Sequence, residues 1–213
     1  EVNFHTQFQQ VNRDIRSTSS QFNQALKLNP TISPYSDLNE SGYNVLTGGN
    51  DTFNPVADVM LKQNDRVEQW LSADASFKLN LPLDIDLQAT VGWQNKNRQD
   101  TNYYNSHHKD CVDNGYHGKA SHSYTKWVDL TTEVTASWMG NINDHKISAV
   151  AGYSFFQSSG ENFGMTNYDF VIDGIGAWDI GKGTWLSEGD AAMNSSKNSR
   201  ERLISFFGRA NWS

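Results

Sequence analysis

Apolar and polar residues alternate along several stretches of this chain. Between Arg66 and Leu81, seven of the eight odd-numbered positions are apolar, and the even-numbered positions are mostly polar or charged. An alternation with a period of two places every second side chain on the same face of a β-strand. We therefore expect a strand over residues 66–81 that has one apolar and one polar face.

The same alternation recurs in five further stretches, so the sequence predicts six strands. These stretches begin near Val2, Ile85, Ser123, Lys146 and Arg200. Two short segments that contain turn residues, 82–84 and 140–145, separate two pairs of strands and predict hairpins. The alternation is already present at the first residues and continues to the last. We therefore expect both ends of the chain to be truncated within a longer sheet.

The connections between the predicted strands alternate between long and short. They cover residues 13–65, 82–84, 98–122, 140–145 and 158–200. In transmembrane β-barrels of the outer-membrane type, long extracellular loops and short periplasmic turns lie at opposite ends of the strands. Within the first long loop, the stretch from Ser20 to Leu28, which ends before Pro30, predicts a short helix. The pattern predicts an all-β, antiparallel, up-and-down segment of a transmembrane barrel.

The apolar side chains of these strands are expected to face lipid. A tilted strand needs about 9–11 residues to cross the hydrocarbon layer, and aromatic rings gather where acyl chains meet headgroups. With the long loops outside, the upper aromatic residues are Trp93, Tyr153 and Phe155, and the lower ones are Phe77 and Trp138. The expected lipid-facing residues are Leu71, Phe77, Val91, Trp93, Val134, Trp138, Tyr153 and Phe206. The positions expected to face a polar lumen include Ser72, Asp74, Gln88, Thr90 and Glu133.

Composition and charge exclude several classes of protein. The aromatic content of 12% is too high for a disordered chain, and a net charge of -7 without any basic run argues against nucleic acid as a partner. Cys111 is the single cysteine, which rules out an internal disulfide framework. The sequence contains no run of about 18 apolar residues, so it predicts no transmembrane helix. No signal peptide is recognised.

Residues that could carry catalysis or bind a metal are present, but their spacing matches no known site. The histidines near Cys111, at positions 107, 108, 117 and 122, lack the intervals of a zinc site. The carboxylates Asp51, Asp58, Asp65 and Glu68 could supply a glycosidase pair only if two of them converged. The glycines between 174 and 183 lack the strand and helix of a phosphate-binding loop. We expect no catalytic residue, no metal and no cofactor.

Aromatic residues are frequent in the predicted long loops. Such rings could stack on sugars or dock a partner protein, and the alternative is that they pack the loops against one another. The candidates for contact with substrate or partner are Tyr103, Tyr104, Trp178 and Trp185.

Five segments carry a resemblance to a known family. They are Asn29–Tyr35, Phe53–Ala57, Leu87–Trp93, His145–Tyr153 and Leu203–Trp212. In their order and spacing they resemble the barrel of the SusC/RagA family of TonB-linked outer-membrane transporters. The resemblance spans essentially the whole chain and is most specific in the last segment.

The resemblance implies a 22-stranded barrel with an N-terminal plug in the cell outer membrane of a Bacteroidetes-type bacterium. It also implies import of glycans, oligosaccharides or peptides, with a SusD-like surface lipoprotein and the TonB complex as partners. Residues 1–213 would be a partial TonB-dependent receptor β-barrel domain, because plug, TonB box and most strands are missing from this sequence. Two other hypotheses stay open: a soluble β-sandwich that binds carbohydrate, and a glycan-processing β enzyme.

Overall fold

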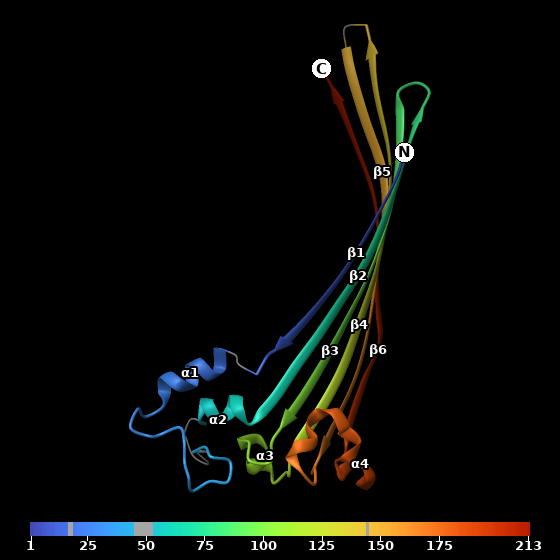
Figure 1. Cartoon of the computed structure of the whole chain (residues 1–213). Coiled ribbons are helices and arrows are strands. Elements are labelled where there is room, and N and C mark those ends of the chain that lie inside the picture. Colours follow the sequence, from blue (N-terminus) through green and yellow to red (C-terminus); the bar gives the residue numbers. More distant parts are fainter. Residues whose placement is uncertain (17–18, 45–52, 144) are drawn as a thin grey trace.

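The strands form one antiparallel sheet in which sequence neighbours are also spatial neighbours (Figure 1). The computed structural model describes residues 1–16, 19–44, 53–143 and 145–213. The strands are β1 (Val2–Asp14), β2 (Lys62–Leu81), β3 (Ile85–Tyr104), β4 (Lys119–Ile142), β5 (His145–Tyr168) and β6 (Ala192–Trp212). The sheet order is β1-β2-β3-β4-β5-β6. This confirms the predicted all-β, up-and-down segment.

All three long loops lie at one end of the sheet, and both hairpin turns and both chain termini lie at the other (Figure 1). We call these the loop end and the turn end. The long loops are shorter than predicted: 15–61, 105–118 and 169–191. The prediction was wrong here because β3 continues to Tyr104 and β5 to Tyr168, beyond the region where apolar and polar residues alternate.

Both hairpins turn tightly, which fixes the register of the strands that they join. Leu83 and Asp84 have φ angles of 71° and 57°, and Asn143 has a φ angle of 55°. Leu81 pairs with Ile85, and Ile142 pairs with His145. Left-handed backbone conformations of this kind are those that match a hairpin turn to the twist of its strands.

Cross-strand partners share a face of the sheet, and the register separates two faces cleanly. One row contains Phe77, Ala89, Val134, Tyr153 and Phe206, and the next contains Ser76, Thr90, Glu133, Ser154 and Ser205. We call these the apolar face and the polar face. All eight residues expected to face lipid lie on the apolar face. All five residues named for a polar lumen lie on the polar face.

The helices all lie at the loop end. They are α1 (Ser19–Lys27), α2 (Pro55–Met60), α3 (Lys109–Asn114), the 3₁₀ helix η1 (Asp173–Lys182) and α4 (Trp185–Glu188). The predicted helix over 20–28 is α1, displaced by one residue, and the glycine-rich stretch over 174–183 forms most of η1. Among the described residues, no helix is long and apolar enough to cross a membrane.

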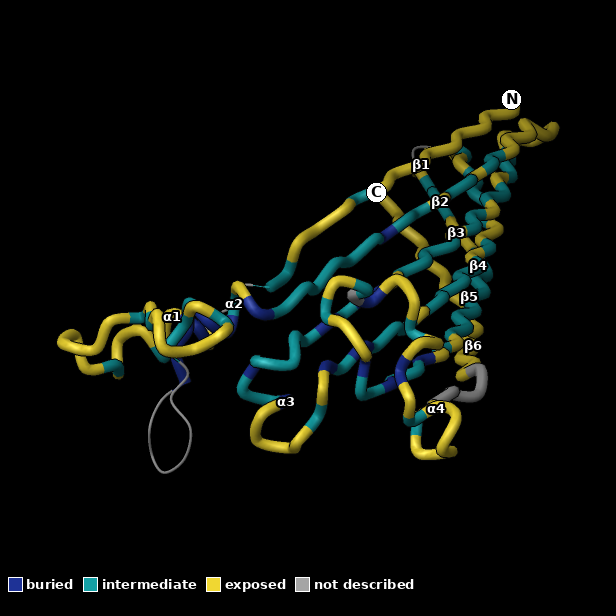
Figure 2. The backbone as a smooth tube through the Cα atoms, turned by 60° about the horizontal axis from the view of Figure 1, so that its bottom comes forward, coloured by how far each residue is buried: buried dark blue, intermediate teal, exposed yellow. Residues whose placement is uncertain are grey.

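Most buried residues also gather at the loop end, around α2 and between α3 and α4 (Figure 2). One cluster joins Phe53, Ala57 and Leu61, and the other joins Tyr103, Ala120, Phe170 and Ala177. Among the described residues, no second layer covers the apolar face of the sheet, where Phe206 is 80% exposed. The apolar face is therefore open to whatever surrounds it.

Candidate functional site: the two faces of the sheet and the loop end

The apolar face carries a continuous region without charge, which we call the apolar band. It extends from Leu81, Ile85, Trp138, Ile147 and Trp212 at the turn end to Phe8, Leu71, Trp93, Val128, Phe155 and Ile204. On β2 it covers ten residue steps from Leu81 to Leu71. At about 3.3 Å per residue and a strand tilt of about 40°, these steps correspond to a height of roughly 25 Å. That height is the height of the apolar zone of outer-membrane barrels.

The limit of the apolar band that lies nearer the loop end, which we call its upper limit, slopes across the sheet. The limit nearer the turn end is its lower limit. The position on β6 that is in register with Leu71 is Arg200, whereas the band on β6 ends at Ile204, four residues nearer the turn end. The limit therefore drops by about 13 Å over four strand spacings, which amount to about 19 Å. The resulting angle is about 35°. When strands cross a flat apolar layer at a tilt of 35–45°, their apolar segments are shifted from one strand to the next, and the limit of the band slopes by the same angle.

Large aromatic residues lie at both limits of the apolar band. Trp93 and Phe155 are the last band residues of β3 and β5 at the upper limit, and Trp138 and Trp212 lie at the lower one. The Trp138 ring covers Gly140, where a Cβ atom would overlap it. Phe77 lies inside the band, four residues before the end of β2, and so does not mark the lower limit as the sequence suggested.

The polar face carries a network of charges in its upper half. Glu68 is 6% exposed and forms ion pairs with two cations, with 3.6 Å from its Oε2 to Nη2 of Arg13 and 3.9 Å from its Oε1 to Nζ of Lys96. Asp100, 8% exposed, accepts from Nε of Arg66 at 2.5 Å and from Nε of Arg98 at 2.6 Å. Because these residues come from β1, β2 and β3, the network fixes the relative position of three strands.

Two tryptophans flank a lysine in this network. Nζ of Lys96 lies 5.0 Å from the ring centre of Trp70 and 5.3 Å from that of Trp127. The three residues occupy directly paired positions on β2, β3 and β4. A cation within about 6 Å of an aromatic ring centre is attracted to the ring face. The arrangement gives the polar face a fixed aromatic and cationic surface beside the carboxylate of Glu68.

Sequence reasoning missed this network because it assigned Arg13, Arg98 and Asp100 to loops and did not work out the register of the predicted strands. The signal was nevertheless available. The short turn at 82–84 sets the register of β2 and β3, and counting back from Leu81 and Ile85 brings Trp70 opposite Lys96 and Glu68 opposite Arg98.

Two of the four candidate aromatic contacts are not loop residues, which corrects the prediction. Tyr103 and Tyr104 are the last residues of β3. Tyr103 is 5% exposed, its ring packs edge-on against Phe170, and its hydroxyl donates to Oδ1 of Asp173 at 2.7 Å. Burial, together with the charge and hydrogen bond of Asp173, raises the pKa of Tyr103. Tyr103 anchors η1 to the sheet.

The other three candidates are more accessible. The ring of Tyr104 packs against His108. Trp185, in α4, packs with Tyr116 and Tyr168 and donates from Nε1 to Oδ2 of Asp169 at 2.5 Å. Trp178, in η1, is 69% exposed. Of the four, Trp178 therefore offers the most free ring surface at the loop end.

A buried carboxylate joins the first two long loops. Oδ1 of Asp58 accepts from Nε2 of His108 at 2.9 Å, and Oδ2 accepts from Nζ of Lys62 at 2.9 Å and from Nε2 of Gln21. Nδ1 of His108 accepts from the backbone N–H of Asp110, so Nε2 carries the proton. Burial alone would raise the pKa of Asp58, but these hydrogen bonds and the Lys62 charge hold it well below its usual range.

The three described carboxylates among those considered for catalysis do not converge. Asp58 lies in the loop cluster, Asp65 accepts from Gln63 at 2.6 Å on the same face as the apolar band, and Glu68 lies on the polar face. Asp51 lies outside the described residues. In the described part of the chain, no group of three or more His, Cys, Asp and Glu side chains could hold a metal ion.

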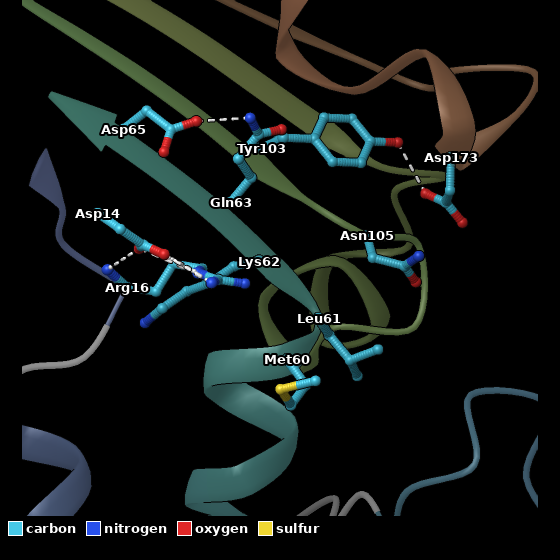
Figure 3. Close-up of a pocket in the computed structure, with 10 residues that line it drawn as sticks. All are labelled: Asp14, Arg16, Met60, Leu61, Lys62, Gln63, Asp65, Tyr103, Asn105 and Asp173. Carbon is cyan, nitrogen blue, oxygen red and sulfur yellow. Dashed lines mark hydrogen bonds and ion pairs between the residues drawn. The ribbon is translucent and has the colours of Figure 1, made fainter. Parts of the chain in front are cut away.

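A cavity of about 440 Å³ lies at the base of the loops, between the ends of β1, β2 and β3 and the start of η1 (Figure 3). Its three carboxylates are already engaged. Asp14 binds Arg16 with Oδ2 2.6 Å from Nη2, Asp65 accepts from Gln63, and Asp173 accepts from Tyr103 and from Ser106. Because the carboxylates of the cavity are paired within the protein, we interpret the cavity as a structural junction between the loops and the sheet.

The fold is similar to that of solved transporter structures. The sequence matches no family profile, and no curated protein resembles it significantly. In structure, the chain is similar to the RagAB peptide transporter, with a TM-score of 0.68, 14% identity and coverage of 80% of this chain and 18% of that one. The RagAB peptide importer in its closed-closed and open-open states gives TM-scores of 0.67 and 0.66 at the same identity and coverage. This chain thus spans about 18% of the length of those structures.

Proposed function

We propose that this chain is part of the wall of a β-barrel importer in the bacterial outer membrane, of the SusC/RagA type. In this proposal the apolar band contacts lipid and the polar face lines the channel. The observation that carries the proposal is the charge-free band itself, because its height of roughly 25 Å and its slope of about 35° match a membrane crossed by tilted strands. The structural likeness to a peptide transporter supports it.

The edges of the sheet support a larger barrel. In the described part of the chain, β1 and β6 each pair on one side and do not pair with each other. Unpaired backbone N–H and C=O groups in hydrocarbon cost several kcal/mol each, so only closed barrels and helices span membranes. Further strands on both sides would complete the wall, and residues 1–213 would form one part of a TonB-dependent barrel domain.

The cargo and partners follow from the same proposal. The substrate would be an oligosaccharide or a peptide, and a SusD-like surface lipoprotein would cover the loop end. Trp70, Lys96 and Trp127 would contact the substrate in the channel, and Trp178 would be available to substrate or lipoprotein. Energy would come from the TonB complex through other parts of the protein.

The soluble alternatives account less well for the structure. A β-sandwich covers its apolar face with a second sheet about 10 Å away and uses strands of 3–10 residues, whereas the strands here have up to 24 residues. A glycosidase needs two carboxylates on either side of the scissile bond. Asp58 and Glu68 are each bound to cations in separate parts of the molecule.

Lipid contact can be measured directly in the full-length protein. A fluorophore attached at Val134→Cys should be quenched by brominated lipids, whereas the same label at Thr135→Cys, the next residue on the opposite face, should not be. Equal quenching at both positions, or at neither, would contradict the proposal. Uptake of labelled oligosaccharides and peptides by cells with and without the gene, and with and without TonB, then identifies the cargo.

A further inference from the structure

On β4 and β6, the first charged residues above the apolar band on the same face are cations. Arg202 and Arg200 follow Ile204 toward the loop end of β6, and Lys126 follows Val128 on β4. Since residues two apart in a strand share a face and lie about 7 Å apart, the two arginine side chains emerge side by side. Both are exposed.

These cations lack the acidic partners that other arginines have. Arg13, Arg16, Arg66 and Arg98 all pair with carboxylates. Among the described residues, no ion pair involves Arg200, Arg202 or Lys126, and Nε of Arg202 donates to the amide oxygen of Gln157 at 2.9 Å. Among the described residues, the carboxylate nearest in register on this face is Glu161, which is the cross-strand partner of Lys126 and lies two residues from Ser159, the partner of Arg200. Within the described part of the chain, three cations against one carboxylate leave the local charge positive.

The surface directly below the arginines is apolar. Ile204 and Phe206 are 57% and 80% exposed, and Phe155 is the cross-strand partner of Ile204. A ligand for this surface would need an anionic group at the level of the arginines and hydrocarbon below it. Phosphate suits a guanidinium because its oxygens accept two parallel hydrogen bonds.

We propose that Arg200 and Arg202 bind the phosphate of an anionic lipid in the outer leaflet, with its acyl chains against Ile204, Phe206 and Phe155. This site rests on the proposed function, since the long loops must lie outside the cell. The lipid headgroup would carry its phosphate on a sugar or on glycerol. Lys126, two strands away, extends the positive border toward β4.

The test uses full-length protein in nanodiscs of neutral lipid, with phosphorylated lipid A and its dephosphorylated counterpart as probes. The double variant Arg200→Gln/Arg202→Gln should bind phosphorylated lipid A at least about tenfold more weakly than the wild type, because charge-assisted hydrogen bonds are lost. Dephosphorylated lipid A should bind the wild type and the variant equally. Inorganic phosphate should not compete, because the acyl contacts contribute.

The matched control is Arg209→Gln, which changes an arginine on the polar face of the same strand near the turn end, where it donates to Asn211. This variant should bind like the wild type. Equal affinity of the double variant and the wild type for phosphorylated lipid A, or no preference for the phosphorylated form, would overturn the site. Quenching of the Val134 label in the same samples separates the two proposals: retained quenching without phosphate dependence refutes only the lipid site, and absent quenching refutes the membrane assignment as well.

Discussion

An arginine in the middle of the apolar band should impair membrane insertion in proportion to its depth. Val134 lies on the central strand β4, is 40% exposed, and has Ala89 and Tyr153 as cross-strand partners. It is four residues from Trp138 at the lower limit and six from Val128 at the upper one. At about 3.3 Å per residue and a tilt of about 40°, these steps place it roughly 10 Å above the lower limit and 15 Å below the upper one.

The expected cost follows from that depth. Arginine on the lipid face of a barrel costs about 2–4 kcal/mol at the midplane and about 0–1 kcal/mol near the interfaces. Val134→Arg should therefore lower the free energy of unfolding by about 2–4 kcal/mol. Leu71→Arg should lower it by about 1 kcal/mol or less, because Leu71 is the last band residue of β2. The structure thus separates two positions that sequence alternation alone treats as equivalent.

The assay is equilibrium unfolding of the full-length protein in lipid vesicles by guanidinium chloride, followed by tryptophan fluorescence. Thr135→Arg is the matched control, because it introduces the same side chain in the same strand at the same depth on the polar face. It should change the free energy of unfolding by less than about 1 kcal/mol, as surface substitutions usually do. If Val134→Arg and Thr135→Arg were equally tolerated, or if Leu71→Arg were the most damaging, the lipid-face reasoning would be wrong.

Four further predictions concern the polar face and the loop end. Gly152→Val should destabilise the protein by about 1–3 kcal/mol in the same unfolding assay, because a Cβ atom would overlap the Phe207 ring. Adding Phe207→Ala to this variant should relieve the loss of stability. If Gly152→Val alone left the stability unchanged, the ring would move freely and the reasoning would be wrong. Asp58→Ala should weaken loop docking by about 1–3 kcal/mol, since it leaves the buried N–H of His108 unpaired, and should speed amide exchange over 53–61 and 105–118. Because the pKa of Asp58 is lowered, its stabilising effect is present above the ordinary carboxyl pKa and is lost only as pH falls through the lowered value. In the wild type, the protection of these amides relative to their intrinsic exchange rates should therefore be equal at pH 7 and pH 5, and lower protection at pH 5 would contradict the pairing. Cys111 is fully buried, and burial raises the pKa of its thiol to about 12. Thiol reagents at pH 8 should therefore modify Cys111 only after the protein unfolds. Rapid labelling of the native protein would refute the burial of this thiol.

The sequence predicted the turn-end half of the sheet well. There, alternation between Leu71 and Leu81 reflects one face that is entirely apolar and one that is polar. Six strands, two hairpins and their faces all follow from this pattern. The structure confirms each of them.

The loop-end half was harder to predict because both faces become polar there. On β3, Asn95 and Asn97 lie on the face of the apolar band, and Lys96 and Arg98 lie on the other, so no alternation marks the strand. Backbone pairing nevertheless continues to Tyr104. The strand is held by cross-strand contacts such as that of Asp100 with Arg66, which appear only when the register is known.

The contacts within the loops could not be predicted from local patterns at all. Asp58 and His108 are 50 residues apart, and Tyr103 and Asp173 are 70 residues apart. Each pair depends on the sheet bringing distant segments of the chain to the same end. The α1 helix was predicted because its signals, a serine near its start and Asn29-Pro30 after its end, are local.

The continuation of the strands beyond the apolar band has a consequence for how the cell surface is encountered. From Phe155 to Tyr168, β5 runs 13 residues further, which raises its tip by roughly 33 Å above the bilayer at a tilt of about 40°. In the proposed orientation, α3, η1 and α4 would stand clear of the inner sugars that coat the outer leaflet. Antibodies and bacteriophages would then meet the loop end and the lipoprotein proposed to cover it first, and selection by immunity or infection would act there while the membrane-embedded half remained shielded.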